Sequence, residues 1–190
     1  MPHRFTARTI AAFAPILALA CSGCVGPDLA VPTTGQPVIA TAGWPFKPAS
    51  VRVFPLTHFD LNAAGEPLLV LHLELTDRWG DSVKAAGSLR VELAAPTRGT
   101  AASEETVLQW DVNLLNLDLN ASRYDPTTAT YRVPLEGLPR WAVQFARGRP
   151  GEAGSPAYAR VRVRFTYVIA DQNGNIVDEL TLRDEAELRG

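Results

Sequence analysis

The chain has 190 residues, of which 46% are hydrophobic and 20% are charged, and its formal net charge is -2. This composition is typical of a folded globular protein and excludes a chain that is disordered throughout. A nucleic-acid-binding surface needs clustered positive charge, and this balance argues against one. The length suits one domain with additional segments.

The first twenty residues have the three zones of a secretory signal peptide. Arg4 and Arg8 give a positive start, residues 10–20 form an uncharged apolar run, and small residues with a cysteine follow. A permanent membrane-spanning helix needs about 20 apolar residues, so this run is too short to be one. We therefore expect residues 1–20 to be removed during export.

The end of this segment, Leu-Ala-Leu-Ala-Cys at residues 17–21, resembles the lipobox of bacterial lipoproteins. In that class the cysteine thiol takes a diacylglyceryl group, and a dedicated signal peptidase cuts just before the cysteine. The resemblance implies that Cys21 is the lipidated residue and that Ala20 fills the small position before it. The class usually has Leu three residues before the cysteine, where this chain has Ala18.

Cys24 is the alternative lipidation site, because Ser22 and Gly23 supply the small residues that usually precede the cysteine. A further alternative is an ordinary signal peptide with unmodified cysteines. The chain has no cysteine beyond these two, which excludes a disulfide framework or a thiolate metal site from the rest of it. Because the residue after Cys21 is not Asp, the resemblance implies an outer-membrane location if the cell has one.

Residues 21–50 are predicted to be the lipidated N-terminus and a Pro/Gly-rich tether, since proline blocks helix and central strand. Residues 51–190 are predicted to form one domain. The pair Trp44 and Phe46 is the exception within the tether. We expect these aromatic rings to cap one end of the domain or to lie against its side, and contact with a membrane or partner is the alternative.

From Val51 onward, apolar and polar residues alternate with a period of two, which marks half-buried strands. Burial on one side only predicts antiparallel sheets with solvent on their outer faces. Turn-forming Asn, Asp and Gly separate the runs. The pattern predicts an all-β fold, a single antiparallel β-sandwich of seven to eight strands. The alternating runs are residues 51–53, 69–75, 89–93, 108–114, 131–135, 161–169 and 180–182.

Two of the turns share the pattern Asp-x-x-Gly-x-x-Val, starting at Asp77 and at Asp171. This strand–turn–strand unit resembles hairpins of immunoglobulin-like and transthyretin-like extracellular domains, and the resemblance implies a sandwich of that kind. Residues 139–145 fit either a short helix, because Trp141 and Phe145 are four apart, or a strand, because they also alternate.

Arg160, Arg162 and Arg164 form a basic stripe on one strand face and are candidates for contact with a ligand or partner. Anionic lipid head groups and acidic polysaccharides are the chemistry that such a stripe would meet. The structural alternative is pairing with acidic residues of a neighbouring strand, for which Glu179 and Glu185 are available.

Trp79 lies at a predicted hairpin tip and is the fourth contact candidate. An exposed indole there would be a stacking platform for a sugar or an anchor for a partner. The alternative is that the ring folds back over the sheet edge.

The sequence carries no catalytic signature and no metal-ligand spacing for its two domain histidines, His58 and His72. We therefore expect no catalytic residue, metal or cofactor. Several aspartates near strand ends offer oxygens for calcium, but capping of turns is the simpler interpretation. These are Asp111, Asp118, Asp125, Asp171 and Asp178.

These patterns predict a membrane-anchored envelope lipoprotein with a non-catalytic binding or structural domain. The expected partners are membrane lipid, through the acylated cysteine, and another envelope protein or a polysaccharide, but not nucleic acid. One alternative is a carbohydrate-binding module, which requires a flat exposed aromatic strip. The other is an envelope hydrolase, which requires a cleft with converging polar side chains.

Overall fold

The computed structural model describes residues 40–41, 46–96, 103–171, 173 and 175–189, which belong to one unit, Thr34–Gly190. Cys21, Cys24 and Trp44 lie outside the described residues. The elements, in chain order, are β1 (Ala40–Thr41), β2 (Ser50–Val53), β3 (His58–Leu61), β4 (Pro67–Thr76), β5 (Ser88–Pro96), β6 (Glu104–Asn113), α1 (Leu117–Arg123), β7 (Tyr124–Asp125), β8 (Thr130–Leu135), α2 (Ala142–Ala146), β9 (Ala159–Ala170) and β10 (Ile176–Leu188).

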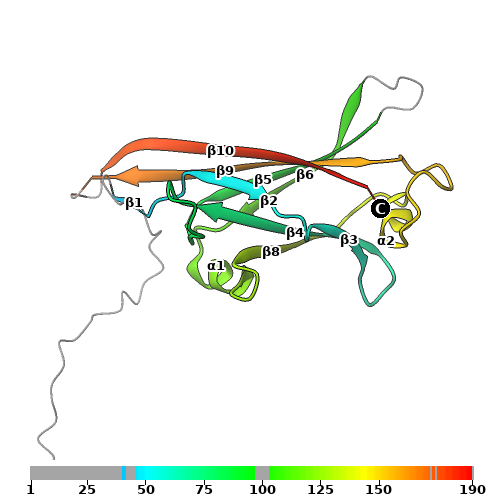
Figure 1. The fold of residues 1–190 in the computed structure, drawn as a ribbon, viewed down its shortest axis with the longest axis horizontal. Coiled ribbons are helices and arrows are strands. Elements are labelled where there is room, and N and C mark those ends of the chain that lie inside the picture. The colour runs from blue at the N-terminus through cyan, green and yellow to red at the C-terminus, as the bar shows by residue number, and fades with distance from the viewer. Residues whose placement is uncertain (1–39, 42–45, 97–102, 172, 174, 190) are drawn as a thin grey trace, which may run out of the picture. The chain divides into compact units, whose positions relative to one another are not determined.

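The first sheet places β6, β5, β9 and β10 side by side, each antiparallel to its neighbour (Figure 1). β1 adds a short parallel pairing at the end of β9. β9 and β10, with 12 and 13 residues, are the longest strands in the part of the chain that is described. A register shift between Leu93 and Ala94 interrupts the pairing of β5 with β6.

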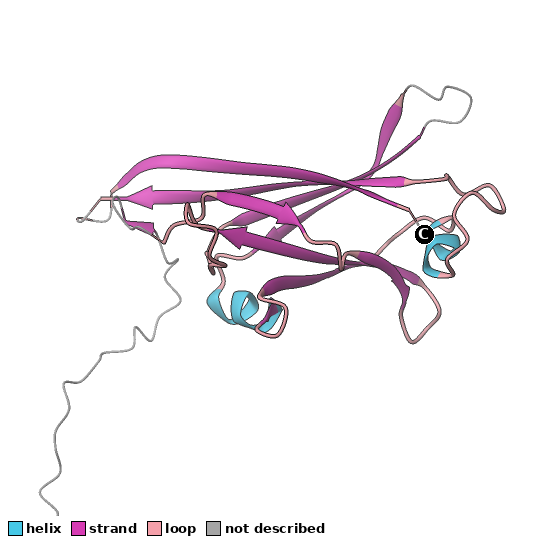
Figure 2. Cartoon of the chain, in the orientation of Figure 1, coloured by secondary structure: helices cyan, strands magenta, loops and turns pink. Residues whose placement is uncertain are grey.

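The second sheet is built around β4 (Figure 2). β8 pairs with one edge of β4, while β2 and β3 pair in succession with different halves of β4. The short strand β7 extends the sheet beyond β8. All of these pairings are antiparallel, which agrees with the sequence prediction.

The two sheets bury their inward faces against each other, and this confirms the predicted all-β sandwich. Leu71 of β4 and Phe165 of β9 are 0% exposed. The seven predicted runs correspond to the seven strands β2, β4, β5, β6, β8, β9 and β10. β1, β3 and β7, which have two to four residues, were not predicted.

Strand pairing starts within the predicted tether. β1 pairs with Ile169 and Ala170, and the Tyr167 hydroxyl donates a hydrogen bond of 2.6 Å to the Pro48 carbonyl. The folded unit therefore includes residues on the N-terminal side of Val51, the predicted boundary.

The outward face of the second sheet differs from the prediction. Solvent was expected there, but Val70 and His72 of β4 are buried, with exposed fractions of 1% and 6%. β4 has neighbouring strands on both of its edges, and the side chains of those strands cover its outward residues. The Nδ1 atom of His72 lies 3.1 Å from the Thr130 hydroxyl, and its ring stacks at 6.4 Å on that of His58.

Three turns close in the same way, with one side-chain oxygen accepting from the backbone N–H groups two and four residues further on. The distances are 2.8 and 3.1 Å at Asp77, 2.8 and 2.9 Å at Asp171, and 3.0 and 2.9 Å at Asn62. Gly65 and Gly80 have φ angles of 77° and 88°, a region that favours glycine. The similarity predicted for the turns at Asp77 and Asp171 is confirmed.

The helix α1 was not predicted. Asn116 caps it by accepting a hydrogen bond of 2.9 Å from the Leu119 N–H. Asn120 is buried, donates to the carbonyl of Ala85 at 2.8 Å, and lies 3.0 Å from the Tyr131 hydroxyl. These bonds hold the helix against the second sheet.

Residues 139–145, which the sequence left open between helix and strand, form most of the helix α2 (Ala142–Ala146) and no strand. Phe145 is buried, and its ring contacts those of Phe59 and Trp141 at 4.9 and 5.4 Å between centroids. The four-residue spacing of the two aromatic residues was therefore the correct signal, because it places both rings on one side of the helix.

Candidate functional site

The outward face of β6, β5, β9 and β10, here called the charged face, brings together most of the residues that the sequence singled out. Alternation places every second residue of each strand on this face, and the strand register aligns these residues in rows across the sheet. One row contains Arg90, Arg164 and Arg183, the next contains Glu92, Arg162 and Glu185, and a third contains Arg160 and Glu187.

Arg160 and Arg162 are neutralised by glutamates. Glu104 of β6 lies 3.3 Å from Arg160 and 2.6 Å from Arg162, and Glu185 bridges both arginines at 3.5 and 3.3 Å. Glu187 adds a hydrogen bond of 3.2 Å that raises the pKa of Arg160 above its usual value. For these two arginines, the alternative that the stripe pairs with acidic residues of neighbouring strands is confirmed.

Of the two proposed partners, Glu185 pairs as expected. Glu179 lies opposite Val168 and forms no ion pair with the stripe in the described part of the chain. The sequence analysis did not identify Glu104, which comes from β6 and reaches the arginines across β5.

Arg164 is in a different environment from the other two. It lies directly opposite Arg90 on β5 and Arg183 on β10. Arg90 pairs with Asp111 at 2.8 Å, and this hydrogen bond lowers the pKa of the Asp111 carboxyl. Among the described residues, Arg164 and Arg183 form no ion pair.

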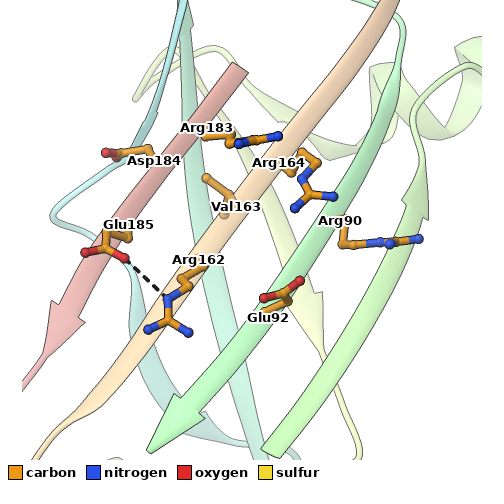
Figure 3. Close-up of a pocket in the computed structure, with 8 residues that line it drawn as sticks. All are labelled: Arg90, Glu92, Arg162, Val163, Arg164, Arg183, Asp184 and Glu185. Atoms are coloured by element: carbon orange, nitrogen blue, oxygen red, sulfur yellow. Dashed lines mark hydrogen bonds and ion pairs between the residues drawn. The ribbon is translucent and has the colours of Figure 1, made fainter. Parts of the chain in front are cut away.

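The three arginines line a shallow hollow of about 350 Å³ on the charged face. Figure 3 shows Arg183, Arg164 and Arg90 on three adjacent strands, while Arg162 turns away towards Glu185. Like charges that face each other across a strand pair repel, so this row costs free energy instead of stabilising the sheet.

A row of hydroxyl groups lies beside the arginine row, two residues further along the strands. Ser88 of β5 and Thr181 of β10 both lie opposite Thr166 of β9. The two threonine hydroxyl oxygens are 3.0 Å apart. Hydroxyl groups both donate and accept hydrogen bonds, so they add neutral donors next to the guanidinium groups.

Trp79 lies in the turn after β4 and is 54% exposed, as the platform interpretation requires. The ring of Phe46, 53% exposed, lies 5.8 Å away but is tilted by 48°. The Arg78 guanidinium covers the indole at 4.3 Å from the ring centroid. These described aromatic rings are not coplanar, and a sugar platform needs a flat strip.

The aspartates considered for calcium have local structural roles. Asp171 closes the turn between β9 and β10, and Asp118 lies in the first turn of α1. The hydrogen bond from the Thr127 N–H lowers the pKa of Asp125. Within the described ranges, no group of three or more His, Cys, Asp or Glu residues is arranged to hold a metal ion.

No family model, curated protein or solved structure matches this chain. Among the residues that the structure describes, no helix is long and apolar enough to cross a membrane.

Proposed function

We propose that this chain is a lipid-anchored protein of the bacterial cell envelope and that its β-sandwich is a non-catalytic binding domain. The charged face is the proposed binding surface. Acylation of Cys21, or alternatively Cys24, would hold the domain at the membrane, which is the outer membrane in a cell that has one. An immunoglobulin-like topology is part of the same proposal.

One observation carries the binding role. The arginines Arg90, Arg160 and Arg162 of the charged face are paired with carboxylates. Arg164 and Arg183, in contrast, face each other without a carboxylate partner in the described part of the chain. A surface selected only for stability gains nothing from this arrangement. Residues that reduce stability and remain exposed are typical of binding sites.

The anchor is tested by the intact mass of the protein extracted from membranes, compared with Cys21→Ser and Cys24→Ser variants. We expect the wild-type protein and the Cys24→Ser variant to start at a lipid-modified Cys21. We expect the Cys21→Ser variant to keep its signal peptide. An unlipidated, released wild-type protein would contradict the anchor, and lipid on Cys24 would move the anchor to that residue.

A carbohydrate-binding role is the second candidate, because Trp79 is exposed beside Phe46. Glycan binding that is lost in a Trp79→Ala variant and kept in an Arg164→Gln variant would favour this role over the charged face.

A further inference from the structure

We propose that the arginine row, Arg90, Arg164 and Arg183, together with the neighbouring hydroxyl row, forms a binding site for a phosphate-bearing ligand. This inference rests on the proposed binding role of the charged face and not on the lipid anchor. It names the chemical class that the face recognises.

The first argument is the charge that remains after ion pairing. Arg160 and Arg162 share three glutamates, and Arg90 has Asp111. Two further carboxylates line the hollow. Glu92 lies opposite Arg162, and Asp184 accepts a hydrogen bond of 2.7 Å from the Val53 N–H of β2. Among the described residues, neither forms an ion pair with Arg164 or Arg183. A localised excess of positive charge therefore remains at Arg164 and Arg183.

The second argument is the geometry of the row. Neighbouring strands are about 4.8 Å apart, so three arginines in register span about 10 Å of the face. The rigid β-sheet holds their Cα positions. Guanidinium groups bind phosphate oxygens with two parallel hydrogen bonds, and adjacent groups can therefore share one phosphate or two linked ones.

The third argument is the composition of the next row. Ser88, Thr166 and Thr181 place three hydroxyl groups beside the guanidinium groups. A phosphate has more acceptor oxygens than one arginine pair can satisfy, and hydroxyl donors complete the set. A phosphate monoester also carries about -1.5 to -2 charges at neutral pH, which matches two uncompensated cations better than one carboxylate does.

The test is a calorimetric titration of the full chain, extracted in non-ionic detergent, with sodium pyrophosphate at constant ionic strength. We expect the Arg164→Gln/Arg183→Gln double variant to bind about tenfold more weakly or worse, since hydrogen bonds to charged groups are lost. Thr166→Val/Thr181→Val should weaken binding about threefold, as neutral donors contribute less. Arg147→Gln, which removes an exposed arginine after α2, is the matched control and should bind as wild type.

Two further arms identify the class and source of the phosphate. Citrate, a carboxylate of high charge, should compete poorly. Mixed micelles of the same detergent with phosphatidylcholine, with and without phosphatidylglycerol, are then added during the pyrophosphate titration. Competition by the phosphatidylglycerol micelles alone would assign the row to a lipid head group, and the lack of competition by either would assign it to a soluble phosphate compound.

The inference is overturned if the double variant binds pyrophosphate as well as wild type does, if citrate binds equally, or if wild type does not bind pyrophosphate. Thermal unfolding without ligand checks that each variant is folded. If the protein is unlipidated but binds pyrophosphate, only the lipid anchor is refuted. If the protein is lipidated but does not bind pyrophosphate, only the phosphate site is refuted.

Discussion

The outward faces of the two sheets differ in what they do with polar residues. On the second sheet, His72 is buried and hydrogen-bonded, so its polarity is part of the packing. On the first sheet, polar side chains remain exposed in rows, and two arginines of one row, Arg164 and Arg183, have no carboxylate partner among the described residues. The difference indicates that the second sheet's outward face serves the fold, whereas that of the first is available for binding.

The largest effect should come from removing the buried histidine. His72→Ala should lower the free energy of unfolding by about 2 kcal/mol, because it opens a gap and leaves the Thr130 hydroxyl without this partner. Arg132, directly opposite on β8 and exposed, is the matched control, and Arg132→Ala should cost less than about 0.5 kcal/mol. Urea unfolding measures both, and equal costs would mean that buried His72 contributes no more to stability than an exposed residue of the same face.

The same histidine should make stability depend on pH. Burial, with repulsion from His58 and Arg132, lowers the pKa of His72 below its ordinary value. The unfolded chain therefore binds a proton more readily, so stability is lost as the pH falls below about 6.5. Urea unfolding at about pH 7.5 and about pH 5.5 measures this loss. A His72→Gln variant should have a flatter profile, and an unchanged profile would assign the dependence to other groups.

On the charged face, the ion pairs of Arg160 and Arg162 should contribute modestly to stability. Glu104→Gln removes the carboxylate shared by Arg160 and Arg162 and should cost about 1 kcal/mol at low salt. The cost should shrink in about 1 M NaCl, where exposed charges are screened. Glu92→Gln is the control, since Glu92 has no ion pair in the described residues. Thermal unfolding with and without salt measures the difference, and a salt-independent cost would indicate lost packing instead.

The smallest effect should have the opposite sign. Arg164→Gln relieves repulsion from the arginines on both sides and should raise the free energy of unfolding by about 0.3–0.5 kcal/mol. For a chain of this size, that is an increase of about 1–2 °C in Tm. Arg162→Gln is the comparison and should lower Tm. If both variants lose stability, the positive charge of the arginine row is balanced by other groups in solution.

The long strands could be predicted from the sequence because they carry a one-sided alternation, as in the valines and Phe165 of β9. Helix α1 was missed because the leucines at 115, 117 and 119 are two residues apart and not at helical spacing, so its signal is the capping side chain of Asn116. Buried His72 was missed because alternation cannot tell whether neighbouring strands cover an outward position.

The candidate site was predicted only in part. Arg164 was found as one of three arginines on a strand, but its partners Arg90 and Arg183 come from β5 and β10. Which residues share a row depends on register, and a shift of one residue moves a side chain to the opposite face. Residue types along one strand therefore indicated a basic surface, but not which of its charges remain unpaired.

The interrupted pairing of β5 and β6 has a consequence for how this protein behaves in crowded conditions. In the described part of the first sheet, β6 pairs with β5 alone, and an open edge strand of ten residues is a template for aggregation between copies. The irregularity at Leu93 and Ala94 disturbs the flat edge, and Glu105 adds negative charge there. Together these features discourage a second molecule from adding its own strand to β6.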